Sequence, residues 1–359
     1  MTPQQARALA TLERLARNLA PAMRAAYERA LRKLAQSGDI DAAAEALASG
    51  DVTGAIEALL PADATAQFAH DLTVAVAQVA SDVGPQTAKE IASIVRVDFS
   101  FIPGSPSAAQ SLRALILGRI APVAAAIKDG LMEVLANGLR LGVNPRVTAR
   151  LARQFIGLTD YDARLLASFA DQIRNDPQTA LTRALRDARF DRTLVKAIDG
   201  APVTDEQLVA MESAYLRQLQ SWRAETWSRT TTLMAIRNTQ TAAWNQMADD
   251  LKIDKSRLVK TWVATMDDRT RPSHVALHGT TIPIDDFFPN GNFTVGDGLG
   301  GDEDWNCRCV QTVRVLPANG TSAADFLRQR AEMFAQQRAQ MGRAAKAANA
   351  AKSPSRRVA

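Results

Sequence analysis

The chain has 359 residues, of which 47% are hydrophobic and 23% are charged. This composition is ordinary for a globular protein, and the length suffices for two or three domains. No stretch has the roughly 18 consecutive apolar residues of a membrane helix, and the N-terminus lacks the apolar region of a secretory signal. The net charge of +5 permits an anionic partner without indicating one. We expect the protein to be made in a cytoplasm and to stay there until assembly carries it elsewhere.

Helical periodicity dominates the first hundred residues, which we interpret as an N-terminal helical region spanning 1–100. Apolar residues recur at steps of three and four, as on one face of a helix. Pro21 is expected to kink or split the first helix, and Gly84-Pro85 predicts a break or turn in the last one. The predicted helices span 3–37, 40–48, 52–60 and 63–97.

A domain limit is predicted at residues 99–107, where two prolines, a glycine and three serines oppose regular structure. Helical patterns resume at 107–141 and define a central helical domain over 107–254. Thr204 and Gln207 have the spacing of a capping box, so a long helix is expected to start there and run to about residue 250.

Alternation typical of strands appears near 258–266, 280–284 and 310–316. It predicts a small antiparallel sheet within an α+β module over 255–316. The expected fold class is therefore mainly α, with helical N-terminal and central regions and this module near the C-terminus. Residues 317–359 are predicted to be a basic helical tail, partly disordered.

The tail is rich in arginine and lysine and has two acidic residues, Asp325 and Glu332. Such blocks are typical of interaction tails, so it either contacts nucleic-acid phosphates or is a solvated helix with a frayed end. No aromatic residue follows Phe334, so base stacking is not supported. The candidate DNA-contacting residues are Arg328, Arg330, Arg338, Arg343, Lys346, Arg356 and Arg357.

Both cysteines and two of the three histidines lie within residues 260–316. His274 and His278 are spaced i, i+4, so on a helix they share one face. With Cys307 and Cys309 they compose a familiar tetrahedral zinc set, although C-x-C is tighter than the usual spacing. Alternatively, the cysteines are small buried residues near a strand start. Their spacing does not favour a disulfide, which argues against a disulfide-stapled secreted domain.

The turn before His274 is dense in charge, with Asp267, Asp268, Arg269 and Arg271. A carboxylate that orients an imidazole is a general-base arrangement, and arginines hold phosphate well. The sequence has no nucleophile elbow, P-loop or H-E-x-x-H motif. Such a turn is more often held by its own Asp–Arg hydrogen bonds. We therefore predict no catalytic residues; the alternative is a metal-dependent enzyme acting on nucleic acid or nucleotides, centred on this turn.

The pattern W-x4-D-x-R-T-R-x-x-H, followed after a variable loop by N-C-R-C, resembles the phage head morphogenesis family, the group named after the F protein of phage Mu. The resemblance covers about 107–316. Gln240 stands where members often have an acidic residue, so no carboxylate role is transferred there. The motif residues are Trp262, Asp267, Arg269, Arg271, His274, Asn306, Cys307 and Cys309.

The resemblance implies a minor head protein of a tailed phage or prophage that acts in procapsid assembly at or near the portal and is not an enzyme. The partners it implies are the portal protein and the major capsid or scaffolding protein, with non-specific contact to double-stranded DNA as a further expectation. The implied location is the virion, in the capsid interior or portal region, after the host cytoplasm during assembly. Roles in DNA packaging and in ejection with the genome are implied for some members. No cofactor is expected, with zinc the one candidate.

Overall fold

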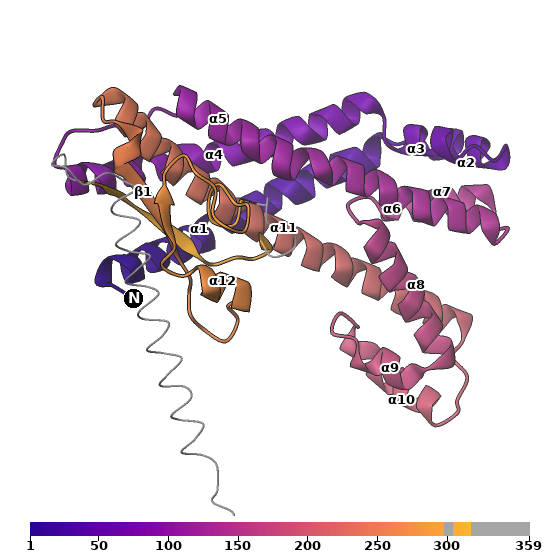
Figure 1. Cartoon of the computed structure of the whole chain (residues 1–359). Helices are drawn as coiled ribbons and strands as arrows, with labels where there is room; N and C mark the ends of the chain where they lie inside the picture. Colours follow the sequence, from indigo (N-terminus) through magenta and orange to yellow (C-terminus); the bar gives the residue numbers. More distant parts are fainter. Residues whose placement is uncertain (298–303, 317–359) are drawn as a thin grey trace, which may run out of the picture.

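The computed structural model describes residues 1–297 and 304–316, in which long helices predominate and a small sheet lies near the C-terminus (Figure 1). The expected fold class is thus confirmed. The helices are α1 (Pro3–Ser37), α2 (Ile40–Ala48), α3 (Val52–Leu59), α4 (Ala62–Val95), α5 (Pro106–Leu115), the π-helix η1 (Ile116–Ile120), α6 (Ala121–Arg140), α7 (Pro145–Gln154), α8 (Asp160–Asn175), α9 (Pro177–Thr182), the 3-10 helix η2 (Ala188–Phe190), α10 (Asp191–Ile198), α11 (Asp205–Asp250), the 3-10 helix η3 (Lys255–Arg257) and α12 (Pro272–Leu277). The strands are β1 (Leu258–Val263), β2 (Thr281–Pro283) and β3 (Val310–Val315).

Helix α11 is the axis of the molecule. Its 46 residues correspond to a length of about 70 Å at 1.5 Å per residue. It begins, as predicted, at the capping box of Thr204 and Gln207. In Figure 1 it runs from the end that carries α8, α9 and α10 to the end that carries the sheet. Helices α1, α4 and α5 pack along it, and we call these four helices the frame.

The core of the frame is built from apolar and aromatic side chains. Tyr27 of α1 stacks on Trp227 of α11 with ring centroids 4.4 Å apart, and Phe169 of α8 stacks on Tyr215 of α11 at 4.2 Å. One hydrophobic cluster takes in side chains from both of the predicted helical regions. The predicted division near residue 100 stays a prediction; the connection between α4 and α5 lies there.

The prediction of a break or turn at Gly84-Pro85 was wrong, and of the two outcomes expected at Pro21, a kink or a split, the split does not occur. Pro21 does not split α1, and α4 continues through Gly84 and Pro85. A proline removes one backbone hydrogen bond, but the buried face of each helix packs on its neighbours on both sides of it. Gly84 serves packing here, because a Cβ at this position would lie 2.0 Å from the Phe101 ring.

The segment predicted as one helix over 107–141 contains the π-helix η1. Pro122 follows it and has no N–H to donate to the carbonyl of Gly118, four residues earlier. The amide of Ala121 instead bonds to the carbonyl of Ile116, five residues earlier, which is the π pattern. Arg119 in this segment lies 4.3 Å above the Trp305 ring, so the irregularity joins the frame to the C-terminal part of the chain.

The three strands form an antiparallel sheet in the order β2-β1-β3, as the alternation predicted. Trp262 pairs with Gln311 and Lys260 pairs with Val313 across β1 and β3. Every residue of β1 is buried, because it is the central strand and α1 and α11 contact the neighbouring strand β3. We call residues 258–297 and 304–316 the module. Among the described helices, none has the length and apolar character that a membrane crossing needs.

Candidate functional site

The module brings three of the four predicted metal ligands together. The Nδ1 atom of His274 lies 3.6 Å from the Sγ atom of Cys307 and 3.6 Å from that of Cys309. The ligand atoms of the three residues all lie within 4.8 Å of one another. Each residue is only 2% exposed. We call these residues the His–Cys–Cys cluster.

A turn before β3 aims both thiols at the histidine. Asn306 has a φ of +54°, a left-handed conformation that asparagine tolerates better than most residues. Its amide donates to Thr230 Oγ1 of α11 at 3.0 Å. The strand begins only at Val310, so neither cysteine is part of it. This turn is how the short C-x-C spacing presents two sulfur atoms to one nitrogen.

His278 lies outside the cluster. Helix α12 ends at Leu277, so His278 does not continue the helical face that carries His274. Its Nδ1 accepts a hydrogen bond from the amide of Ala264 at 3.1 Å, and burial lowers its pKa. His274 and His278 do not share a helical face, because α12 ends one residue before His278.

The pKa values of the two thiols shift in opposite directions. A hydrogen bond from the Cys309 thiol lowers the pKa of Cys307 well below its usual range, and the nearby Arg237 guanidinium lowers it further. The same hydrogen bond, together with burial, raises the pKa of Cys309. Gly296 leaves room for this arrangement, since a Cβ there would lie 3.1 Å from Arg237 and 3.2 Å from the Cys307 sulfur.

Asp267 and Arg308 form a bidentate ion pair, with both oxygen–nitrogen distances at 2.6 Å. The Asp267 carboxylate also accepts the Thr270 hydroxyl at 2.9 Å and lies 3.7 Å from Arg269. The hydrogen bond from Arg308 is the main reason that the pKa of Asp267 lies far below its usual range. These contacts hold the carboxylate within the turn, so it does not form the Asp–His pair of a general base.

Arg271 and the aromatic rings close the surroundings of the cluster. The Arg271 guanidinium donates to the Trp305 carbonyl at 2.8 Å, which ties the start of α12 to the segment before the cysteines. Trp262 meets the His274 ring edge-on at 5.3 Å and the Phe288 ring at 5.1 Å. The predicted motif residues thus contact one another or the backbone of the module.

Lys260 is a buried cation that the sequence reasoning missed. Its Nζ atom donates to the carbonyls of Ile284 and Phe293 at 2.7 and 2.6 Å and lies 3.9 Å from the Phe293 ring centroid. Burial lowers its pKa to about 8, against the opposing effect of nearby carboxylates led by Asp285. The contacts fix the chain after β2 onto the central strand.

The second missed feature is a polar stripe on α11 that receives the module. Arg237 donates to the Cys307 carbonyl, Asn238 accepts the Thr294 hydroxyl at 2.6 Å, and Thr241 accepts the Gln311 amide at 2.7 Å. Residues 227–239 are all buried except for Arg229. A sequence signal was present, because polar residues recur there within a helix that should be core, and buried polar groups need partners.

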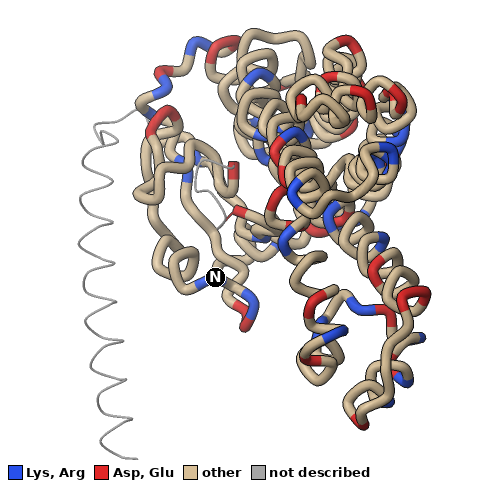
Figure 2. The backbone as a smooth tube through the Cα atoms, turned by 90° about the vertical axis from the view of Figure 1, so that its right-hand side faces the viewer, with Lys and Arg blue, Asp and Glu red and all other residues tan. Residues whose placement is uncertain are grey.

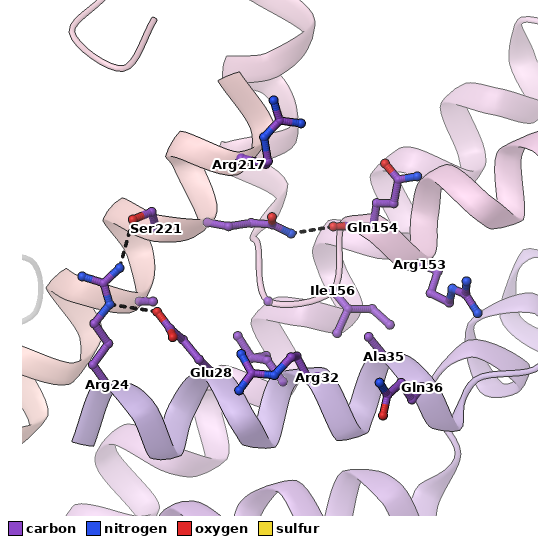
Figure 3. A pocket seen from close by; sticks show the side chains of 14 residues that line it. Arg24, Glu28, Arg32, Ala35, Gln36, Arg153, Gln154, Ile156, Arg217 and Ser221 are labelled. Carbon is purple, nitrogen blue, oxygen red and sulfur yellow. Dashed lines mark hydrogen bonds and ion pairs between the residues drawn. The ribbon is translucent and has the colours of Figure 1, made fainter. Parts of the chain in front are cut away.

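A groove of about 590 Å³ lies between α1 and α11 of the frame and the neighbouring helix α7 (Figure 3). Arg24 is held there by Glu28 at 2.8 Å and by Glu225 at 2.6 Å. The other arginines that line the groove are exposed; they are Arg32, Arg153 and Arg217. The groove is thus basic at its rim and apolar inside, where Leu31, Ala35 and Ile156 lie.

The candidate DNA-contacting residues, from Arg328 to Arg357, lie outside the described residues. Gln240, which replaces an expected acidic residue, is half-buried and lines a groove of about 710 Å³ beside Trp244.

Comparison with known proteins gives one match. The family described as Phage Mu protein F like protein matches residues 171–312. This range contains α11, the sheet as far as Thr312, and the whole His–Cys–Cys cluster. It does not include residues 107–170, to which the resemblance was also expected to extend. Neither the curated proteins nor the solved structures contain a match to this chain.

Proposed function

We propose that this chain, whose residues 171–312 match the Phage Mu protein F like family, is a phage head protein that docks on other head proteins during procapsid assembly. The partners in this proposal are the portal protein and the major capsid or scaffolding protein. The site of action is the capsid interior, at or near the portal.

One observation carries the proposal: the charged motif residues are used for internal contacts. Asp267 holds Arg308, and Arg271 holds the Trp305 carbonyl. Groups that are fixed on each other are suited to maintaining a shape. A hydrolytic site would instead need a base within reach of a substrate.

The basic groove of the frame favours a partner with an acidic surface. Arg32, Arg153 and Arg217 are exposed around an apolar floor, while Glu28 in the same groove is neutralised by Arg24. Over the described chain as a whole, basic and acidic residues are interspersed (Figure 2). An acidic segment of a head protein with apolar side chains would complement both parts of the groove.

Co-expression with the portal, scaffolding and capsid proteins of the same phage tests the docking. We expect the chain to sediment with procapsids and the triple charge reversal Arg32→Glu, Arg153→Glu, Arg217→Glu to reduce its incorporation at least tenfold. The matched control reverses three other exposed arginines, Arg113, Arg140 and Arg192. Equal incorporation of both triple variants would exclude the groove as the docking surface. If the wild-type chain did not sediment with procapsids, docking on head proteins would be excluded altogether.

Contact with packaged DNA through the basic tail is a separate part of the proposal. Release of counterions makes such binding weaken steeply as salt rises. We expect removal of the chain from Thr321 onward to lower DNA affinity and to flatten its salt dependence. A full-length control replaces Arg328, Arg330, Arg338 and Arg343 with glutamine and should reproduce most of the loss. Unchanged affinity in both variants would refute a DNA role for the tail.

A further inference from the structure

The nitrogen–sulfur distances within the His–Cys–Cys cluster are close to those of a metal site. Zinc binds thiolates at about 2.3 Å and imidazole nitrogen at about 2.0 Å in tetrahedral geometry, which places neighbouring N and S ligand atoms about 3.5 Å apart. The Nδ1 atom of His274 is 3.6 Å from each of the two sulfur atoms. We propose that His274, Cys307 and Cys309 bind one zinc ion, which holds α12 against the segment before β3.

Hydrogen bonding alone accounts poorly for this arrangement. Nδ1 of a neutral imidazole has one lone pair, which accepts one thiol hydrogen in good geometry. With Nδ1 unprotonated, the two thiols supply at most two hydrogens for the three contacts among that nitrogen and the two sulfur atoms. A cation between the three atoms satisfies all of them at once.

The surroundings suit a closed structural site. All three residues are 2% exposed, which keeps solvent and substrates away from the thiols. Two thiolates and a neutral imidazole neutralise Zn²⁺, and soft sulfur ligands select zinc over magnesium or calcium. A fourth ligand would complete the tetrahedron from outside this trio.

The ion would act as a cross-link. It joins residues 274 and 307, which are otherwise connected through β2 and the chain that follows it. Closing a loop of this size restricts the unfolded chain, and the binding free energy adds to the stability of the fold.

The zinc site is independent of the proposed role in head assembly. A module without zinc would leave the docking proposal intact, and a zinc-bound module that fails to join procapsids would leave the zinc site intact.

Metal analysis of the full chain, purified without an affinity tag that binds metal, is the first test. We expect about one zinc per chain, a fall in Tm on treatment with a chelator, and recovery of Tm when zinc is added back. Absence of zinc, together with a Tm that neither chelator nor added zinc changes, would overturn the proposal.

Cobalt substitution identifies the ligands. Co²⁺ in the chelator-treated chain should show the thiolate charge-transfer absorption and the visible bands of a tetrahedral site. His274→Asn should lose zinc and these bands, whereas the matched control His278→Asn should keep both. If the His274 variant does not fold, modification of the thiols of the wild-type chain by an organomercurial should release zinc in proportion to the thiols lost. Equal metal retention by the two histidine variants, or thiol modification without zinc release, would refute the assignment.

Discussion

The frame and the module are stabilised in different ways. The frame depends on continuous apolar faces and stacked rings, such as Tyr27 on Trp227. The module has a smaller apolar cluster around Trp262 and Phe288, and depends on single polar contacts made by Lys260, Arg237 and Asp267. Apolar contacts are numerous and individually replaceable, whereas each polar contact leaves a buried group unsatisfied when it is broken. The stability of the module should therefore depend strongly on a few polar residues and on pH and salt. The stability of the frame should depend mainly on the volume of its buried side chains.

The largest effect is expected in the frame. Trp227→Ala removes a ring that is 1% exposed and should lower the free energy of unfolding by about 3–5 kcal/mol. Trp222 on the same helix is 48% exposed, so Trp222→Ala should cost less than about 1 kcal/mol. Urea denaturation followed by circular dichroism measures both. Similar losses of unfolding free energy for the two variants would show that the Trp227 ring is not part of the core.

A single polar contact should matter nearly as much in the module. Arg237→Met keeps much of the side-chain volume but removes the charge beside Cys307 and the donor to its carbonyl. We expect a loss of about 3 kcal/mol, the cost of leaving buried polar partners unsatisfied. The control Arg217→Met changes an exposed residue of the same helix and should be within about 0.5 kcal/mol of wild type. A loss below about 1 kcal/mol for Arg237→Met would contradict the role given to this residue.

Lys260 should give the module a distinctive pH dependence. Burial lowers its pKa from 10.5 to about 8, so between these values the folded chain binds fewer protons than the unfolded chain. Stability from this group therefore rises with pH across that window, by at most ~1.4 kcal/mol per pH unit. Lys260→Met should remove the rise. The comparison stays below pH 10, because burial raises the pKa of Tyr27 to about 12 and lowers stability above pH 10. Parallel wild-type and Lys260→Met curves from pH 8 to 10 would argue against a buried ammonium.

The smallest effect is expected at the Asp267–Arg308 pair, which is partly exposed. Asp267→Asn should lower Tm slightly at low salt and less at high salt, because solvent and ions screen such pairs. The folded-state pKa of Asp267 is depressed, so its contribution is present above the ordinary carboxyl range and is lost as pH falls. Asp268→Asn, at the exposed neighbouring position, serves as the control. A salt-independent loss would indicate that the carboxylate acts by another contact.

The sequence predicted the frame well because apolar periodicity is local information. Spacing and capping residues located α1 and α11, and alternation located all three strands. The errors came from tertiary context. Pro85 stays inside α4 because packing supports it, and the bulge at η1 follows from Pro122 within a run that otherwise reads as one helix.

The site was only partly predictable. His274, Cys307 and Cys309 could be selected by residue type, but His278 was excluded by the exact end of α12. The contacts of Lys260 and Arg237 join residues tens of positions apart, for which one sequence offers no spacing rule. Their signal was indirect, since each is the one charged residue of an otherwise uncharged segment, 230–246 for Arg237 and 258–263 for Lys260.

The central claim is that this chain is a structural part of a phage head. The most direct measurement is the protein composition and yield of heads purified from cells that carry or lack its gene. The account predicts that the chain is present in purified heads, and that deletion lowers the yield of complete heads until the gene is restored. Heads that lack the chain and form in equal yield without it would contradict the claim.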